Sequence, residues 1–146
     1  MNTQNHPTWL VSLEIAKELK AIGFDKPILF HYYEHDFDII IETNSYYNEG
    51  EAQGYLHFYI SAFKEENFNR DKKCISLPTW EQVFAWFRAK GYYGNLEATS
   101  KGTSAYIFTP EVDYGECWEF AYKESYEEAR ETLLFKLIDL YKVANQ

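Results

Sequence analysis

The sequence predicts an α+β fold in a single domain, residues 1–146, with antiparallel sheet and three main helices in the order α-βββ-α-βββ-α. The length of 146 residues suits one domain, and 46% apolar with 25% charged residues is ordinary globular usage. Three segments repeat apolar residues at helical spacing, and short apolar runs between glycine- or proline-containing connectors predict the strands.

The tripeptide Pro-Thr-Trp occurs twice, at residues 7–9 and 78–80. Each copy precedes a helix-like segment that ends at a glycine followed by an aromatic residue. This pattern divides the chain into similar halves, residues 7–63 and 75–146, and either a duplication or separate use of the same helix-start and helix-stop chemistry explains it. Because a repeated tripeptide arises readily by chance in a chain of this length, we favour the second explanation.

The first half is expected to hold one helix and three strands. The helix should begin at Trp9 or Ser12 and end at Ile22, followed by Gly23 in a left-handed conformation. A charged connector then separates the two halves. The strand-like runs cover residues 28–33, 37–42 and 55–63, and the connector covers residues 64–73.

The second half begins at a clear helix start, because Thr79 and Gln82 have the spacing of a capping box. The apolar face of this helix is expected to consist of Trp80, Val83, Phe84 and Phe87, with Trp86 away from its centre. Gly91 should end the helix. Three strand-like runs with short connectors suit an antiparallel meander. They cover residues 93–99, 105–109 and 117–122.

The last helix is expected from a second capping box, Ser125 with Glu128, to about Val143. Its apolar stripe is broader than a half-exposed helix requires, so we expect the helix to lie across a sheet.

Charge is distributed unevenly along the chain, whose formal net charge is −9. Residues 34–66 sum to −7 and residues 111–146 to −5, whereas residues 67–110 sum to +3. Nucleic-acid binding requires lysine and arginine to replace the counterions of the phosphates, so no nucleic-acid partner is expected.

The two cysteines, Cys74 and Cys117, form no CxxC motif and are expected to be reduced thiols in the cytoplasm. The N-terminal residues resemble no signal peptide, and no apolar run is long enough to span a membrane. We therefore expect no association with a membrane.

Motifs for catalysis or cofactor binding are absent from the sequence. It contains no GxSxG nucleophile motif and no glycine-rich phosphate loop, so neither an enzymatic activity nor a cofactor is the leading expectation.

Three helix-forming segments carry a resemblance to a known group of proteins. They are residues 11–20 with Gly23-Phe24, residues 78–82 with 86–88, and residues 126–130 with 136–138. In these segments the chain resembles the small uncharacterised proteins encoded in phage and prophage regions of Bacteroides-like bacteria. The resemblance implies a bacterial cytoplasm and an accessory phage role, and it implies no catalytic residue.

A polar cluster around the first strands offers ligands that zinc or manganese would accept. The candidate metal ligands are His31, His35, Asp36, Asp38 and His57. A turn near His35 would break the alternation of side chains, so we favour a solvated hairpin tip. The alternative is a small metal-dependent enzyme.

Aromatic residues make up 19% of the chain, more than a core of this size needs. The leading functional hypothesis is a protein-interaction module with a tyrosine-rich acidic surface, which binds another protein or a second copy of itself. Packing of tyrosines under a second layer is the structural alternative, and a small-ligand pocket is a third hypothesis. The candidate interaction residues are Tyr32, Tyr46, Tyr47, Tyr55, His57, Tyr59 and Trp86.

Overall fold

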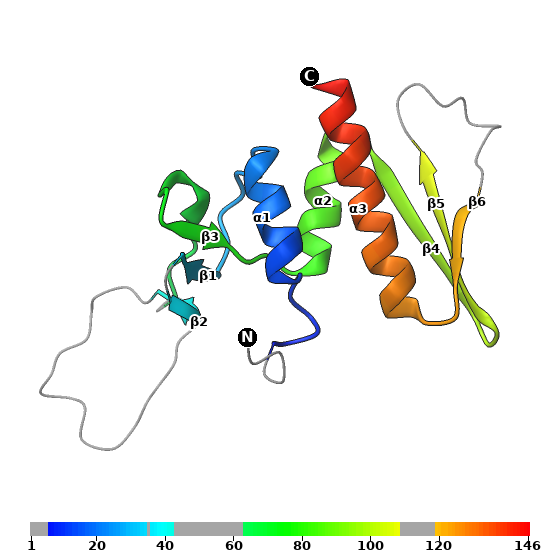
Figure 1. Cartoon of the computed structure of the whole chain (residues 1–146), viewed down its shortest axis with the longest axis horizontal. Helices are drawn as coiled ribbons and strands as arrows, with labels where there is room; N and C mark the ends of the chain where they lie inside the picture. Colours follow the sequence, from blue (N-terminus) through cyan, green and yellow to red (C-terminus); the bar gives the residue numbers. More distant parts are fainter. Residues whose placement is uncertain (1–5, 35, 43–62, 109–118) are drawn as a thin grey trace, which may run out of the picture. The chain divides into compact units, whose positions relative to one another are not determined.

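The structure is a computed structural model that describes residues 6–34, 36–42, 63–108 and 119–146 (Figure 1). These residues form three α-helices, one short 3₁₀ helix and two three-stranded antiparallel sheets. The predicted α+β class and the element order α-βββ-α-βββ-α are confirmed. The chain divides into two compact units, Met1–Pro78 and Thr79–Gln146, at the second Pro-Thr-Trp.

The first unit contains a three-stranded sheet with its first strand in the middle. Its elements are α1 (Leu13–Ala21), β1 (Phe30–Tyr33), β2 (Asp36–Ile41), the 3₁₀ helix η4 (Phe68–Arg70) and β3 (Cys74–Ser76). β1 pairs in antiparallel fashion with β2 on one side and with β3 on the other. α1 contacts β3 and buries Ile15, Ala16 and Leu19.

The third strand of this unit differs from the expected one. β3 lies between the expected charged connector and the second helix, where we expected no strand, and its three residues are too few to show an alternating pattern. The strand expected at residues 55–63 lies outside the described residues, apart from Phe63.

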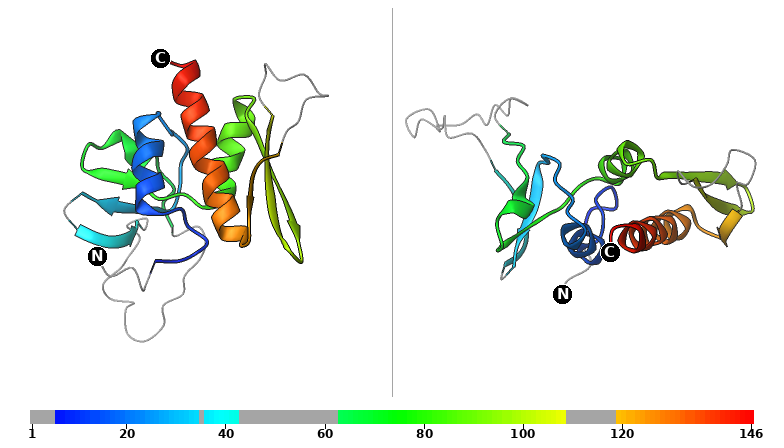
Figure 2. Two further views of the ribbon diagram at one scale, coloured as in Figure 1. Left: turned by 45° about the vertical axis from the view of Figure 1, so that its right-hand side comes forward. Right: turned by 90° about the horizontal axis from the view of Figure 1, so that it is seen from above.

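The second unit contains a meander covered by a long helix. Its elements are α2 (Trp80–Ala89), β4 (Tyr93–Thr99), β5 (Gly102–Phe108), β6 (Glu119–Lys123) and α3 (Tyr126–Ala144). The sheet order is β4-β5-β6, and α3 contacts all three strands while α2 contacts β4 (Figure 2). The expectation that the last helix lies across a sheet is confirmed. Its buried residues are Ala129, Leu133, Leu134, Leu137 and Ile138.

The first two helices end in the same way. Gly23 and Gly91 both have a φ angle of +85°, and each is followed by an aromatic residue. The amide of Phe24 donates to the carbonyl of Leu19 at 2.9 Å, and the amide of Tyr92 donates to that of Phe87 at 3.0 Å. These bonds define Schellman motifs. The glycine–aromatic pairs are therefore helix stops, as the sequence predicts.

The helix starts differ from one another. Ser12 caps α1, and Thr79 with Gln82 forms the complete capping box expected for α2. At α3, Ser125 Oγ accepts from the amide of Glu128 at 3.1 Å, which is only one of the two bonds of a capping box.

Candidate functional site

The sheet of the second unit has one face against α3 and one face that no described helix of that unit covers. A β-carbon on Gly94 would lie 3.0 Å from Leu133 of α3, so Gly94 is on the helix side. Side chains alternate along a strand, and Tyr93 and Glu97 therefore lie on the opposite side. Their partners across the ladder, Phe108 and Ser104, share that side.

The third strand extends this surface. Ser104 pairs with Tyr122 and Tyr106 pairs with Glu119 in the ladder between β5 and β6. We call the resulting surface the tyrosine–carboxylate face. It consists of Tyr93, Tyr106, Phe108, Tyr122, Glu97 and Glu119.

Hydrogen bonds fix the polar groups of the tyrosine–carboxylate face. The hydroxyl of Tyr106 donates to Glu97 Oε2 at 3.1 Å, and the hydroxyl of Ser104 donates to Glu119 Oε1. The bond to Glu97 raises the pKa of the Tyr106 hydroxyl. Because each carboxylate accepts only one of these bonds, most of its lone pairs point to solvent.

Two tyrosines on this face are largely open to solvent. Tyr93 is 51% exposed and Tyr122 is 52% exposed. The hydroxyl of Tyr122 donates to the carbonyl of Lys101 at 2.7 Å, which holds its ring over the β4–β5 turn. A fixed, half-exposed tyrosine loses little side-chain entropy on binding, as is typical of interface anchors.

None of the sequence-based interaction candidates within the described residues belongs to this face. Tyr46, Tyr47, Tyr55, His57 and Tyr59 lie outside the described residues. The other two, Tyr32 and Trp86, are buried in the structure, with 5% and 2% of their surface exposed.

Tyr32 is buried, and its hydroxyl has a hydrogen-bond partner. The hydroxyl lies 2.9 Å from His6 Nδ1, and His6 Nε2 lies 2.8 Å from the carbonyl of Val11. A carbonyl can only accept, so His6 Nε2 carries the proton, and in neutral imidazole Tyr32 donates to Nδ1. The expectation of an accessible Tyr32 is wrong.

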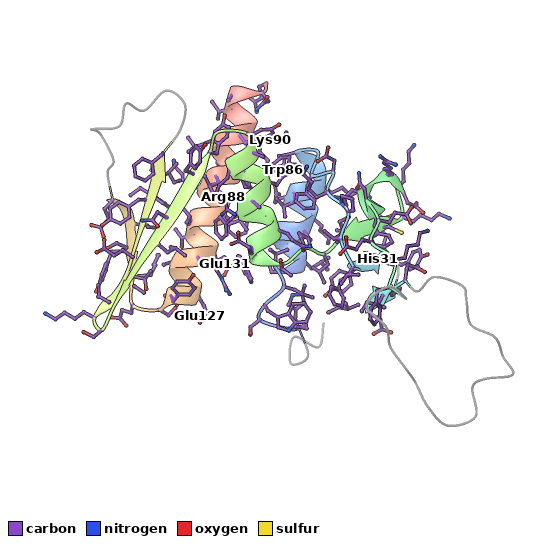
Figure 3. All side chains as sticks on the ribbon, turned by 180° about the vertical axis from the view of Figure 1, so that it is seen from behind. His31, Trp86, Arg88, Lys90, Glu127 and Glu131 are labelled. Carbon is purple, nitrogen blue, oxygen red and sulfur yellow. The ribbon has the colours of Figure 1, made fainter. Side chains whose placement is uncertain are left out.

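Trp86 is buried because the inward face of α2 is shifted from the expected one, so that Trp80 and Phe84 are only half-buried. Val83, Trp86 and Phe87 are the buried residues of the helix. The Trp86 ring lies 5.2 Å from that of Tyr141, and the ammonium of Lys90 covers it at 4.5 Å (Figure 3). Six of the eight residues from position 80 to position 87 are apolar or aromatic, so two helical stripes that share Val83 and Phe87 were possible. From the sequence we favoured the stripe without Trp86.

The metal cluster that the sequence offered as an alternative does not assemble among the described residues. His31 is fully buried, Asp38 is exposed, and no three histidine, cysteine or acidic side chains within the described ranges are placed to hold a metal. Asp36 lies in β2, and His35 and His57 lie outside the described residues. The carboxylate near His31 is that of Glu42, with Oε1 3.6 Å from Nε2.

Cys74 has no features of a catalytic nucleophile. It is a free, buried thiol, and burial together with the neighbouring Asp71 raises its pKa, so it stays protonated at neutral pH. Cys117 lies outside the described residues. None of the helices in the described part of the chain combines the length and apolar character of a membrane span.

Comparisons with protein-family models, with curated proteins and with solved structures give no match to this chain. The tyrosine–carboxylate face is therefore assigned from geometry. Part of this face could be predicted from the sequence, because alternation along the predicted strand at residues 93–99 places Tyr93 and Glu97 on one side.

Proposed function

We propose that the chain is a protein-interaction module whose tyrosine–carboxylate face binds an arginine-bearing basic segment of another protein. The observation that supports this most strongly is the exposure of Tyr93 and Tyr122 beside hydrogen-bonded carboxylates on a sheet face that no described helix of the unit covers. The resemblance to phage and prophage proteins favours a phage or host partner in a bacterial cytoplasm.

The chemistry of the face favours arginine over other groups. A guanidinium stacks on a tyrosine ring and also pairs with a carboxylate through two parallel hydrogen bonds. Glu97 and Glu119 lie one strand away from exposed or half-buried rings, so one arginine can reach both kinds of group. The net charge of −9 attracts a basic segment and repels nucleic-acid phosphates.

Charge also argues against two copies of this face binding each other. Both would present Glu97 and Glu119, and like charges brought together across an interface are unfavourable. A different protein is the better partner.

The test is a nuclear magnetic resonance titration of the whole chain with a capped hexa-arginine peptide, with hexaglutamate as the control peptide. Saturable shifts at β4, β5 and β6 are expected for hexa-arginine alone. Tyr93→Ser and Glu97→Gln should each weaken binding by about two- to fivefold, the range for exposed cation–π contacts and ion pairs.

Glu131→Gln is the matched control because Glu131 is an exposed carboxylate on α3 (Figure 3). It removes the same charge as Glu97→Gln and should leave the affinity within about twofold, the weight of a distant screened charge. Equal weakening by both variants would mean that net charge alone attracts the peptide, and the proposal would then fail.

A further inference from the structure

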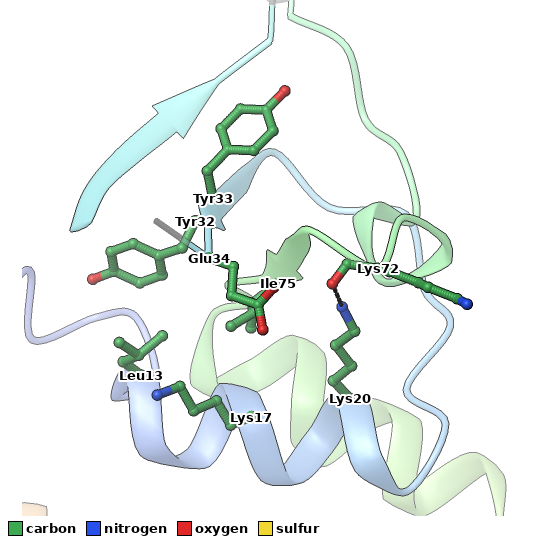
Figure 4. Close-up of a pocket in the computed structure, with 8 residues that line it drawn as sticks. All are labelled: Leu13, Lys17, Lys20, Tyr32, Tyr33, Glu34, Lys72 and Ile75. Carbon is green, nitrogen blue, oxygen red and sulfur yellow. Dashed lines mark hydrogen bonds between the residues drawn. The ribbon is translucent and has the colours of Figure 1, made fainter. Parts of the chain in front are cut away.

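The first unit contains a cavity of about 280 Å³ that is separate from the tyrosine–carboxylate face (Figure 4). Residues of α1, of β1 and the position after it, and of β3 and the segment leading into it surround it. The lining residues are Leu13, Lys17, Lys20, Tyr32, Tyr33, Glu34, Lys72 and Ile75.

Part of the cavity wall is apolar. Leu13, Ile75 and the ring of Tyr32 contribute this part, and Tyr32 and Ile75 are both buried. The Tyr32 hydroxyl is bonded to His6, so the residue presents its ring to the cavity. Such a wall suits a flat apolar or aromatic group.

Positive charge dominates the rest of the lining. Three lysines and a single carboxylate, that of Glu34, line the cavity, although the whole chain has a net charge of −9. The cavity is thus a local exception to the acidic character of the protein, and it attracts anions.

Lys20 supplies a positive charge that is fixed in place. Its ammonium donates to the carbonyls of Asp71, Lys72 and Cys74 at 3.0, 3.0 and 2.5 Å. These bonds use all three of its protons without neutralising it. The charge therefore stays at the cavity wall whether or not a ligand is bound.

Lys17 is the cation best placed to bind a ligand directly. Its ammonium lies beside Leu13 in Figure 4, and it forms no ion pair with any described residue. Lys72 also lacks an ion pair within the described ranges, but its ammonium points away from the other lining residues in Figure 4. Glu34 lies between Tyr32 and Lys20 and opposes part of this positive charge.

We infer that this cavity binds a small organic anion, a carboxylate or phosphate monoester that carries an aromatic or apolar group. The ring would lie against Tyr32, Leu13 and Ile75, and the anionic group would pair with Lys17 in the field of Lys20. The volume is near the lower limit of small-molecule sites, about 300 Å³, and suits one ring with one charged group.

The binding test is a titration of the whole chain with benzoate and phenyl phosphate, followed by nuclear magnetic resonance. Both anions should give saturable shifts at Leu13, Tyr32 and Ile75, with a dissociation constant on the order of 1 mM for ligands of this size. Benzylamine, which has a similar ring and a positive charge, should give none. Absence of saturation with both anions, or equal binding of benzylamine, would overturn the inference.

Three variants then locate the site. Lys17→Gln should weaken the binding of phenyl phosphate by about two- to fivefold, because it removes one partly exposed charge. Glu34→Gln should strengthen this binding to a similar extent. Lys26→Gln is the matched control, because Lys26 is an exposed lysine of the same unit outside the cavity.

If Lys17→Gln and Lys26→Gln weaken phenyl phosphate binding equally, diffuse positive charge attracts the ligand and the cavity is not a specific site. Weaker binding by Glu34→Gln would mean that the ligand donates to that carboxylate, which contradicts a simple anion. All three variants lie in the first unit, whereas the tyrosine–carboxylate face lies in the second.

Discussion

At the scale of single residues, His31 is completely buried although its polar ring atoms form no hydrogen bond with a described residue. Its ring is 0% exposed and stacks on Phe68, with ring centres 4.0 Å apart. Neither ring nitrogen has a hydrogen-bond partner within the described residues, and the carboxylate of Glu42 is 3.6 Å away. Burial lowers the pKa of His31 from 6.5, and the negative charges of Glu42 and Glu66 offset only part of this effect.

This environment predicts that stability falls as the pH drops below 6.5. The unfolded chain takes up a proton near that pH, whereas the folded chain does so only at a lower pH, so protonation favours unfolding between the two values. The stabilisation is complete above pH 6.5 and is lost toward the folded-state pKa, at no more than about 1.4 kcal/mol per pH unit.

His31→Phe should reduce this dependence while retaining the stack on Phe68. The measurement is the melting temperature of both proteins from pH 7.5 to 5.0. Between pH 6.5 and 5.5 the melting temperature of wild type should fall more than that of the variant. Parallel curves would show that His31 is not the group that titrates.

At the scale of elements, helix ends are the best-determined local structures in this chain. The hydroxyl of Thr79 accepts from the amide of Gln82 at 3.2 Å, and the amide of Thr79 donates to Gln82 Oε1 at 2.8 Å. These two bonds satisfy amides that α2 itself leaves without a partner.

Thr79→Ala should lower the free energy of unfolding by about 1 kcal/mol, because alanine cannot cap the helix. Thr79→Ser keeps the hydroxyl and should stay within about 0.5 kcal/mol of wild type, since serine and threonine are similar caps. Urea unfolding measured by circular dichroism gives both values. An alanine variant as stable as the serine variant would contradict a stabilising role for the box.

These elements also show which local structures can be predicted from the sequence. Caps and glycine stops depend on residues within five positions of each other, so Thr79, Gln82, Gly23 and Gly91 could be assigned in advance. The inward direction of Trp86 depends on Tyr141, 55 positions later, and no local pattern reports that contact. β3 is likewise defined by pairing with a distant strand, since Cys74 lies opposite Tyr33.

The same distinction between local patterns and long-range contacts applies to the two candidate sites. Alternation at residues 93–99 was visible in the sequence, but the uncovered side of the sheet depends on where α3 packs. The cavity joins Lys17 to Glu34 and Lys72, which lie on separate segments, so it could not be predicted from spacing.

At the scale of the whole molecule, the two halves share an element order without sharing a topology. Within the described residues, the first strand is central in one sheet, β2-β1-β3, and the second strand is central in the other, β4-β5-β6. Duplication of one unit would preserve the pairing order. The repeated Pro-Thr-Trp is therefore better explained by similar helix-boundary chemistry.

The division at Pro78 predicts that residues 79–146 fold without the first unit. This fragment has a meander with α3 on one face, and its buried side chains come from both helices. Domains of about 55–65 residues commonly fold alone, so the size is sufficient. The fragment should unfold cooperatively on heating and reproduce the nuclear magnetic resonance shifts of α3 in the whole chain.

Two substitutions in the fragment test whether its core is the native one. Leu137→Ala removes a fully buried side chain and should cost about 2–5 kcal/mol, whereas Val143→Ala, at a position 73% exposed, should cost less than about 0.5 kcal/mol. Similar losses from both variants would indicate a collapsed state without specific packing. A fragment with no cooperative transition would instead favour the single domain that the sequence predicts, because the core of residues 79–146 would then be insufficient by itself.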